Sequence, residues 1–262
     1  IMSINLKELS SEFNNLKLDY DLKKKNWFNI GGKTKIYYKA NNLKDLIKFL
    51  KRIEEKEKIF VLSGGSNTLI TDKTYNGVVI KLSSNFNNIS LLSDEIVVAG
   101  SAVSDKSLSE FAMNNSIGGF EFLSCIPGTV GGGIKMNAGC FEREFKDILI
   151  SIQAINKSGQ VITIPAKDIN FEYRNSNLSD DLIFLSASFK GYKKKLDVIK
   201  NEMMDLKKKK EKAQPTRIKT SGSTFKNPID QSKKKVWELI KESVPLDKSI
   251  GDACISEKHC NF

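Results

Sequence analysis

The segment "IPGTVGGGIKMNAG", residues 126–139, decides the fold: it contains five glycines, one proline and a single charged side chain. Glycine has no Cβ, so a glycine-rich backbone can approach another surface closely and adopt conformations that other residues avoid. The rest of the chain is rich in charge, with 42 lysine and arginine residues. We therefore expect residues 126–139 to face a bound group through backbone amides rather than side chains.

A second glycine segment, "LSGGSNTLI" at residues 62–70, supports this expectation. It reads as a strand that ends at Gly64 and Gly65, followed by Ser66 and Asn67, where small residues let successive amides converge on a phosphate. It lacks the Gly-Lys-Ser/Thr of a P-loop and does not match GxGxxG. Alone, a Gly-Gly pair after a strand is more often only a turn, but two such segments together indicate a dinucleotide that lies across both.

The composition is that of a globular protein, with 262 residues of which 40% are hydrophobic and 28% charged. No apolar run approaches the roughly 20 residues of a membrane-spanning helix, and the polar N-terminal region has no signal-peptide core. We expect a cytoplasmic protein without membrane contact. The spacing of the cysteines fits neither a zinc site nor a disulfide framework, so we expect reduced thiols at Cys125, Cys140, Cys254 and Cys260.

The net charge of +11 raises the question of a polyanionic partner. The sharpest basic run, "KKKKEK" at residues 207–212, continues a helical pattern and is predicted to be a solvated face. No basic motif with interleaved aromatic residues is present, so nucleic-acid binding is not expected. A basic protein can equally serve a small anionic substrate. A polyanion-binding protein without catalytic chemistry stays open as the alternative from a different class.

Hydrophobic periodicity predicts an α+β order of elements. Helices are predicted at residues 6–22, 43–53, 104–116 with a Ser104 cap, 193–213 and 233–243. Strands are predicted at residues 33–40, 59–65, 77–82, 88–93, 95–102, 149–165 as a hairpin, and 182–192. Gln214 and Pro215 indicate a boundary after the long basic helix.

Five motifs, in this order, closely resemble the UDP-N-acetylenolpyruvoylglucosamine reductase family, whose members are flavoenzymes of peptidoglycan precursor synthesis. They are "NWFNIGG" (26–32), "LSGGSNTLI" (62–70), "GGFEFLSCIPGTVGGGIKMNAG" (118–139), "YRNS" (173–176) and "SGSTFKNP" (221–228). The resemblance extends from about Asn26 to the last residue.

The resemblance implies a two-part FAD-binding domain of the vanillyl-alcohol-oxidase (PCMH) type and a smaller α/β substrate-binding domain. We expect FAD-binding subdomains at residues 1–80 and 81–195, and a linker helix with the substrate-binding domain at 196–262. That last domain is expected to be C-terminally incomplete. A monomer is expected.

The resemblance also assigns the cofactor residues, and it implies non-covalent FAD reduced by NADPH, with no metal. The only histidine, His259, lies outside the flavin motifs, in agreement with a non-covalent flavin. The residues implied to hold the pyrophosphate are Gly64, Gly65, Ser66 and Asn67. Those implied to lie along the flavin are Ile126, Pro127, Gly128, Thr129, Gly132, Asn137, Ala138 and Gly139.

The implied reaction reduces the enolpyruvyl ether of UDP-N-acetylglucosamine enolpyruvate to the lactyl ether of UDP-N-acetylmuramate. Hydride addition at C3 builds negative charge on C2 and its carboxylate, so the site needs a cation and a proton donor. Arg174 matches the family's active-site arginine, whose guanidinium binds a carboxylate bidentately. Ser223 matches the serine that protonates C2. Without the family, an arginine on the surface and a serine in a turn would be the simpler readings.

Three further residues are implied near the substrate. Lys226 and Asn227 are expected to orient its phosphates or sugar, and Tyr173 to contact it or merely to pack. The family's catalytic glutamate follows "SEKHCNF" and has no match among these residues, since Glu257 belongs to another motif. Without that part we expect FAD to bind, because its motifs precede residue 140, and turnover to be severely impaired.

Only a short stretch separates Arg174 from the helix at residues 193–213. An inserted tyrosine-bearing loop of one family subclass therefore has no room here, which indicates the shorter subclass with a more open cleft. The alternative among enzymes is another FAD oxidoreductase of the same fold, such as an oxidase that uses oxygen. The flavin motifs alone permit it, whereas "YRNS" and "SGSTFKNP" argue against it.

Overall fold

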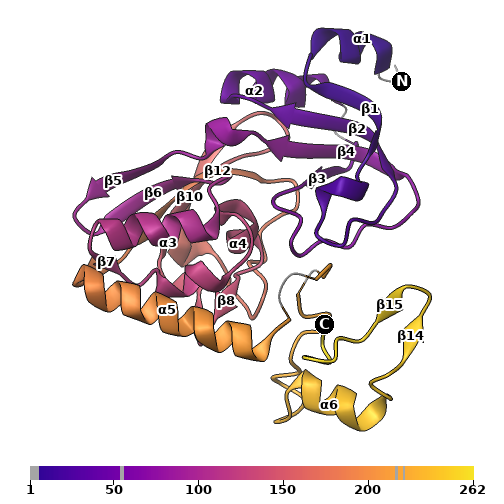
Figure 1. The fold of residues 1–262 in the computed structure, drawn as a ribbon. Helices are drawn as coiled ribbons and strands as arrows, with labels where there is room; N and C mark the ends of the chain where they lie inside the picture. The colour runs from indigo at the N-terminus through magenta and orange to yellow at the C-terminus, as the bar shows by residue number, and fades with distance from the viewer. Residues whose placement is uncertain (1–5, 54–55, 216–217, 221) are drawn as a thin grey trace.

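A computed structural model describes residues 6–53, 56–215, 218–220 and 222–262 of the protein. Two β-sheets with helices packed on them form most of the molecule, and a smaller C-terminal part lies beside them (Figure 1). Among the described residues, no helix combines the length and the apolar character needed to cross a membrane.

The elements are as follows. The α-helices are α1 Leu6–Glu12, α2 Leu43–Arg52, α3 Asp105–Asn114, α4 Val130–Lys135, α5 Leu196–Ala213 and α6 Val236–Ser243. The longer strands are β1 Leu16–Asp21, β2 Lys33–Ala40, β3 Ile59–Val61, β4 Tyr75–Leu82, β5 Ile89–Ser93, β6 Ile96–Gly100, β10 Leu149–Ile155, β11 Val161–Pro165 and β12 Ile183–Lys190. The two-residue strands are β7 Ile117–Gly118, β8 Gly139–Cys140, β9 Arg143–Glu144, β13 Tyr192–Lys193, β14 Ser249–Ile250 and β15 Ala253–Cys254. The 3₁₀ turns are η1 Lys23–Lys25, η2 Ser84–Phe86, η3 Glu121–Cys125, η4 Phe145–Asp147 and η5 Ala166–Asp168.

The first sheet has the order β1-β2-β4-β3 and is mixed, since β2 and β3 run parallel to β4 while β1 is antiparallel to β2. Helix α2 starts where predicted, with the Asn42 side chain accepting a bond from the Asp45 amide at 2.8 Å. Its Phe49 ring stacks on Tyr38 of β2, with centroids 3.9 Å apart, and meets Phe13 edge-on. Aromatic packing therefore holds the helix on this sheet.

The predicted helix over residues 6–22 is wrong in its second half. Helix α1 ends at Glu12, and Leu16–Asp21 forms β1, which pairs with β2 in the register Leu16 to Tyr38. Leu16, Leu18 and Tyr20 point inward at every second position, which is the period of a strand. Pairing with β2 gives the backbone N–H and C=O groups of these residues hydrogen-bond partners, and β1 becomes an edge strand of the sheet.

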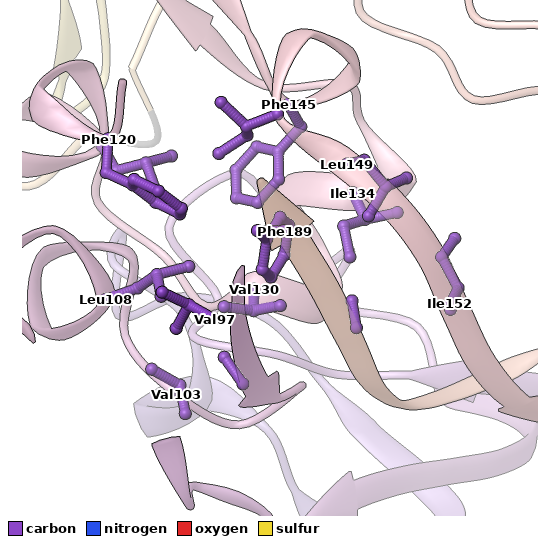
Figure 2. Packing of buried hydrophobic residues seen from close by; sticks show 14 of the residues in the cluster. Val97, Val103, Leu108, Phe120, Val130, Ile134, Phe145, Leu149, Ile152 and Phe189 are labelled. Atoms are coloured by element: carbon purple, nitrogen blue, oxygen red, sulfur yellow. The ribbon is translucent and has the colours of Figure 1, made fainter. Parts of the chain in front are cut away.

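The second sheet is antiparallel, with the order β11-β10-β12-β6-β5. The predicted hairpin at 149–165 is confirmed, and it turns at Gly159, where φ is +80° and the amide donates to the Asn156 carbonyl at 2.9 Å. Helices α3 and α4 and the turns η3 and η4 bury a core against this sheet. Figure 2 shows Phe145 and Phe189 at its centre, with ring centroids 6.0 Å apart.

Close packing explains part of the glycine-rich segment at residues 126–139. A Cβ on Gly133 of α4 would overlap the ring of Phe145, and one on Gly131 would lie 3.1 Å from Ser101 Cβ. These glycines let α4 approach η4 and the residues after β6. Helix α4 therefore packs on the core, and the glycine-rich segment continues on both sides of it, at residues 126–129 and 136–139.

Helix α5 runs along α3 and η3 on the outside of the second sheet (Figure 1). Its end at Ala213, before Gln214 and Pro215, is confirmed. Helix α6 and the β14–β15 hairpin form the C-terminal part, where α6 contains no fully buried residue. The division into residues 1–80, 81–195 and 196–262 stays a prediction.

Phe145 should be a main support of the second core. We expect Phe145→Ala to lower the free energy of unfolding by about 3–5 kcal/mol, because the cavity left by the ring cannot be refilled by rigid neighbours. Denaturant unfolding measures the change. As a control, Leu92→Ala on β5, where the side chain is 69% exposed, should change stability by under about 0.5 kcal/mol. An equal effect of both substitutions would contradict this account of the core.

Candidate functional site

One large cavity, of about 2330 Å³, lies where the two sheets and the C-terminal part face one another. Its lining comes from segments far apart in the sequence, mainly within residues 56–68, 81–87, 101–105, 126–147 and 222–227. Of the cofactor and substrate residues predicted from the sequence, all except Gly64 and Asn137 line it. The tertiary structure thus brings the predicted motifs to one place.

The two glycine loops contact each other directly. Ser66 Oγ donates to the Pro127 carbonyl at 2.6 Å, and the hydroxyls of Ser63 and Thr129 are 2.5 Å apart. Gly64 does not line the cavity because it packs against Gly128, where an added Cβ would lie 3.7 Å from the Gly128 Cα. Both loops therefore form a single wall of the cavity.

Several positions on this wall accept only glycine or a very small side chain. Gly65 has a φ of +69°, and a Cβ there would overlap the Lys25 carbonyl. Gly128 has a φ of +156°, and a Cβ on Gly132 would lie 2.9 Å from Ser63 Oγ. The wall consequently presents backbone, which suits the close approach of a flat or phosphorylated group.

Two ionisable side chains lie in this wall. Lys81 Nζ donates to the Ser63 carbonyl at 2.6 Å, and burial, followed by the charges of Lys25 and Lys39, lowers the pKa of Lys81. Asp105 is 1% exposed, and burial raises the pKa of its carboxyl to about 8. A cation and an acid kept neutral at neutral pH make this wall attractive to an anionic group.

Arg174 is held at the cavity by Glu144 and by the carbonyls of Asn137 and Gly139. Its Nη1 lies 3.0 Å from Glu144 Oε1, its Nη2 donates to the Gly139 carbonyl at 2.9 Å, and its guanidinium stacks on the Tyr173 ring. The backbone of Arg174 has a φ of +57°. A Cβ on Gly139 would lie 3.0 Å from Arg174 Nη1, so this glycine makes room for the guanidinium.

Asn137 is a structural residue in this arrangement rather than a wall residue. It is fully buried, its Nδ2 donates to Glu144 Oε2 and to the Glu172 carbonyl at 3.0 Å each, and its Oδ1 accepts from the Lys146 amide at 3.1 Å. It thereby ties the end of α4 to the Glu144 and Arg174 segments.

Residues 222–228 of the last motif reach the Arg174 segment. Lys226 Nζ donates to the Arg174 carbonyl and Asn227 Nδ2 to the Tyr173 hydroxyl, both at 3.4 Å. Ser223 is exposed on the cavity wall, in a segment that Asn261 holds by a bond from the Thr224 amide to its carbonyl at 2.8 Å. Lys226 and Asn227, predicted to bind the substrate, therefore contact the segment of Tyr173 and Arg174 at the cavity.

Two thiols lie behind Arg174. The side-chain interaction of Cys125, at the end of η3, with Cys140 of β8 lowers the pKa of Cys125 and raises that of Cys140. Lys210 of α5 donates to the Cys125 carbonyl and adds a favourable charge. All four cysteines of the chain are free thiols. In the described part of the chain, no cluster of three or more His, Cys, Asp or Glu side chains could hold a metal.

The sequence analysis missed four residues of the site, Lys81, Asp105, Glu144 and Asn261. A weak signal exists for Glu144, because Glu144 and Asp147 form a capping box around η4. Lys81 and Asp105 lie in ordinary strand and helix patterns, and Asn261 lies 36 residues from its partner Phe225. Only the folded chain shows their surroundings.

Comparison with known proteins agrees with this geometry. Residues 34–165 match the FAD binding domain family, and residues 214–262 match the C-terminal domain of UDP-N-acetylenolpyruvoylglucosamine reductase. The UDP-N-acetylenolpyruvoylglucosamine reductase of Pelagibacter ubique (strain HTCC1062) is 67% identical over 255 residues, covering 97% of this chain and 83% of that protein. The chain belongs to the UDP-N-acetylenolpyruvoylglucosamine reductase family.

Other members of the UDP-N-acetylenolpyruvoylglucosamine reductase family are similar over the same extent. That of Rickettsia bellii (strain RML369-C) is 42% identical over 259 residues, covering 99% of this chain and 84% of that protein. The crystal structure of the Thermus caldophilus reductase superimposes with a TM-score of 0.81 at 27% identity, covering 94% of this chain and 87% of that one. The predicted fold is therefore confirmed, while the shorter subclass stays a prediction.

A more distant structure shares the fold alone. A variant of Phl p 4, a glucose oxidase, superimposes with a TM-score of 0.55 at 12% identity. The match covers 73% of this chain and 44% of that one. This type of fold therefore also occurs outside the UDP-N-acetylenolpyruvoylglucosamine reductase family. The match of residues 214–262 is to the C-terminal domain of that family.

Asn137 should be needed for stability of the site. We expect Asn137→Ala to lower the free energy of unfolding by about 2–4 kcal/mol, since it leaves buried partners unpaired and places alanine at a φ of +39°. Asn29→Ala is a matched control, because Asn29 is exposed at a φ of +56° and should cost about 1 kcal/mol or less. Chemical denaturation of both variants gives the comparison, and equal losses would show that backbone strain alone matters.

Proposed function

We propose that this protein reduces the enolpyruvyl ether of UDP-N-acetylglucosamine enolpyruvate to UDP-N-acetylmuramate, with FAD and NADPH, in peptidoglycan precursor synthesis. The observation that supports this most directly is the meeting of the Arg174 and Ser223 motifs at one cavity that two glycine loops wall. The family membership of the chain gives the reaction. The cavity is large enough for a dinucleotide and a nucleotide sugar together.

The residues of the glycine-loop wall fit FAD. The positive φ of Gly65 and of Gly128 favours glycine, so the wall presents backbone at these positions, and Lys81 supplies a nearby cation for phosphate. We propose that Gly65, Ser66 and Asn67 hold the pyrophosphate, with Gly64 shaping the loop. The flavin is proposed to lie along the remaining residues of this wall, which are Ile126, Pro127, Gly128, Thr129, Gly132, Ala138 and Gly139.

When bound, FAD supplies the chemistry of hydride transfer from NADPH to C3 of the enolpyruvyl group. Arg174 provides the positive charge that the substrate carboxylate needs as charge builds on C2. Its contacts with Glu144 and the Gly139 carbonyl fix the guanidinium in advance, so it requires little reorganisation during the reaction.

Ser223 is proposed to deliver the proton to C2. Its hydroxyl is a weak acid, so the transfer depends on the developing carbanion as a strong acceptor and on close placement. Asn261 holds the adjacent backbone at Thr224 and Phe225, which limits the positions that Ser223 can take. We propose that the nucleotide sugar binds to Lys226, Asn227 and Tyr173. Lys226 donates to the Arg174 carbonyl and Asn227 to the Tyr173 hydroxyl.

The proposal also gives a setting for the protein. We propose that the protein is a monomer. NADPH and nucleotide sugars are substrates of the cytoplasm, which supports a cytoplasmic enzyme. We also propose the domain division at residues 80 and 195, because each part then contributes residues to the lining of the cavity.

Visible absorption of the purified protein, after mixing with FAD and removing the excess, tests the proposed function first. We expect a retained flavin band that NADPH bleaches and that returns, without oxygen, only after the enolpyruvyl nucleotide sugar is added. Recovery by oxygen alone at the same rate would favour an oxidase of the same fold. A colourless protein would refute the cofactor assignment.

Arg174 should affect the second half of this cycle. In Arg174→Ala we expect bleaching by NADPH to be unchanged and recovery by the nucleotide sugar to be slower by about 10²–10³-fold, because a charge-stabilising group is lost. Arg174→Lys should recover only partly, since an ammonium lacks the planar fork. Arg143→Ala is the control, since Arg143 also lines the cavity and pairs with Asp147. Equal slowing by both alanine variants, measured by stopped-flow absorbance, would contradict the role of Arg174.

A further inference from the structure

Asp105 is an unusual acid for its position. It is the first residue of α3, after the Ser104 cap, where an aspartate is ordinarily exposed and interacts with the helix N-terminus. Here it is 1% exposed, and neither carboxyl oxygen has a hydrogen-bond partner among the described residues. A buried polar group without a partner is unfavourable, so such a group in a native protein indicates an interaction still to be made.

The carboxyl of Asp105 lies at the wall of the large cavity, directly behind the glycine loops. Its Oδ2 is 3.1 Å from the position of a Cβ on Gly128, and Ser66 Oγ is 3.5 Å from the same position. Its backbone amide donates to the Gly128 carbonyl at 3.2 Å. Because position 128 is glycine, no side chain separates Asp105 from the space between the two loops.

The surroundings of Asp105 favour its neutral form. The segments packed around it, 63–67, 101–104 and 126–129, contain no titratable side chain, and the next residue, Lys106, pairs with Glu110 at the surface. The positive end of α3 acts in the opposite direction. Burial is nevertheless sufficient to raise the pKa of the carboxyl to about 8, so the acid carries a proton at neutral pH.

We propose that Asp105 is a cofactor-binding residue whose protonated carboxyl donates a hydrogen bond, past Gly128, to an oxygen of the bound FAD. The inference rests on the proposed function, because it assumes that FAD occupies the wall formed by the glycine loops. Pyrophosphate, ribityl and flavin oxygens all accept hydrogen bonds, and a phosphate would repel a carboxylate but accept from a carboxylic acid. The neutral acid thus completes a wall that otherwise offers backbone amides and Lys81.

At high pH, the Asp105 carboxyl must therefore take up a proton when the protein binds FAD. In the free protein the carboxyl loses its proton above about pH 8, whereas the bond to FAD favours the protonated form and raises the pKa further. Affinity for FAD should therefore be constant below about pH 8 and decrease by up to about tenfold per pH unit above it. One proton is taken up for each FAD bound in that upper range.

The dissociation constant of FAD, measured by flavin fluorescence from about pH 6 to about pH 9.5, tests this proposal. Asp105→Asn keeps the shape and a donor but cannot titrate, so its affinity should be within about threefold of the wild type at low pH and should not fall at high pH. Asp105→Leu removes the donor and should bind about 10- to 100-fold more weakly at every pH. Asp197→Asn, in the exposed first turn of α5, is the control and should keep the wild-type profile.

Two results would overturn the inference while leaving the proposed function intact. One is a wild-type affinity that stays constant across the range, which needs no variant to observe. The other is a decrease at high pH that persists in Asp105→Asn, because the titrating group would then be Lys81 or the flavin itself. Failure of the wild-type protein to bind FAD at any pH would refute the proposed function and this inference with it.

Discussion

The contact between the loops at residues 63–67 and 126–129 is the constraint on which the site depends. The first loop follows β3 of the first sheet, the second precedes α4, which packs on the second sheet, and Gly64 meets Gly128 with no side chain between them. The hydroxyl pair of Ser63 and Thr129 and the bond from Ser66 to the Pro127 carbonyl lock this approach. Once the loops are joined, their amides face the same cavity, and a ligand that binds one loop must also lie against the other.

A second network sets the reactive side of the cavity. The buried side-chain amide of Asn137 bonds to two segments, at Glu144 and Lys146 and at Glu172, and its partner Glu144 in turn holds the Arg174 guanidinium. The arginine is in a backbone conformation with positive φ, which is unfavourable unless its surroundings determine it. Here the surroundings do so through Glu144, Gly139 and the Tyr173 ring. Positive charge is therefore placed before any substrate arrives, and the motif that contains Ser223 packs against the same segment.

Local sequence predicted most elements where a local cause determines them. Helix α2 starts at Leu43 as predicted, the predicted Ser104 cap starts α3, and Pro215 follows the end of α5. The prediction failed at Leu16–Asp21, where a pattern compatible with a helix became an edge strand because β2 offered its backbone partners. The glycines at 126–139 were interpreted through a ligand, yet packing on Phe145 requires Gly133, and Gly131 packs closely on Ser101.

The sequence by itself determined the family, the glycine loops and the motifs of Arg174 and Ser223, because each of these is recognised from a contiguous segment of the chain. The tertiary structure alone decided which distant residues meet them. Lys81, Asp105, Glu144 and Asn261 carry no distinctive local pattern, and they join the site through sheet pairing and close loop contact. The ionisation of Asp105 was likewise decided there, because a pKa depends on the burial and partners of a group, and these exist only in the folded chain.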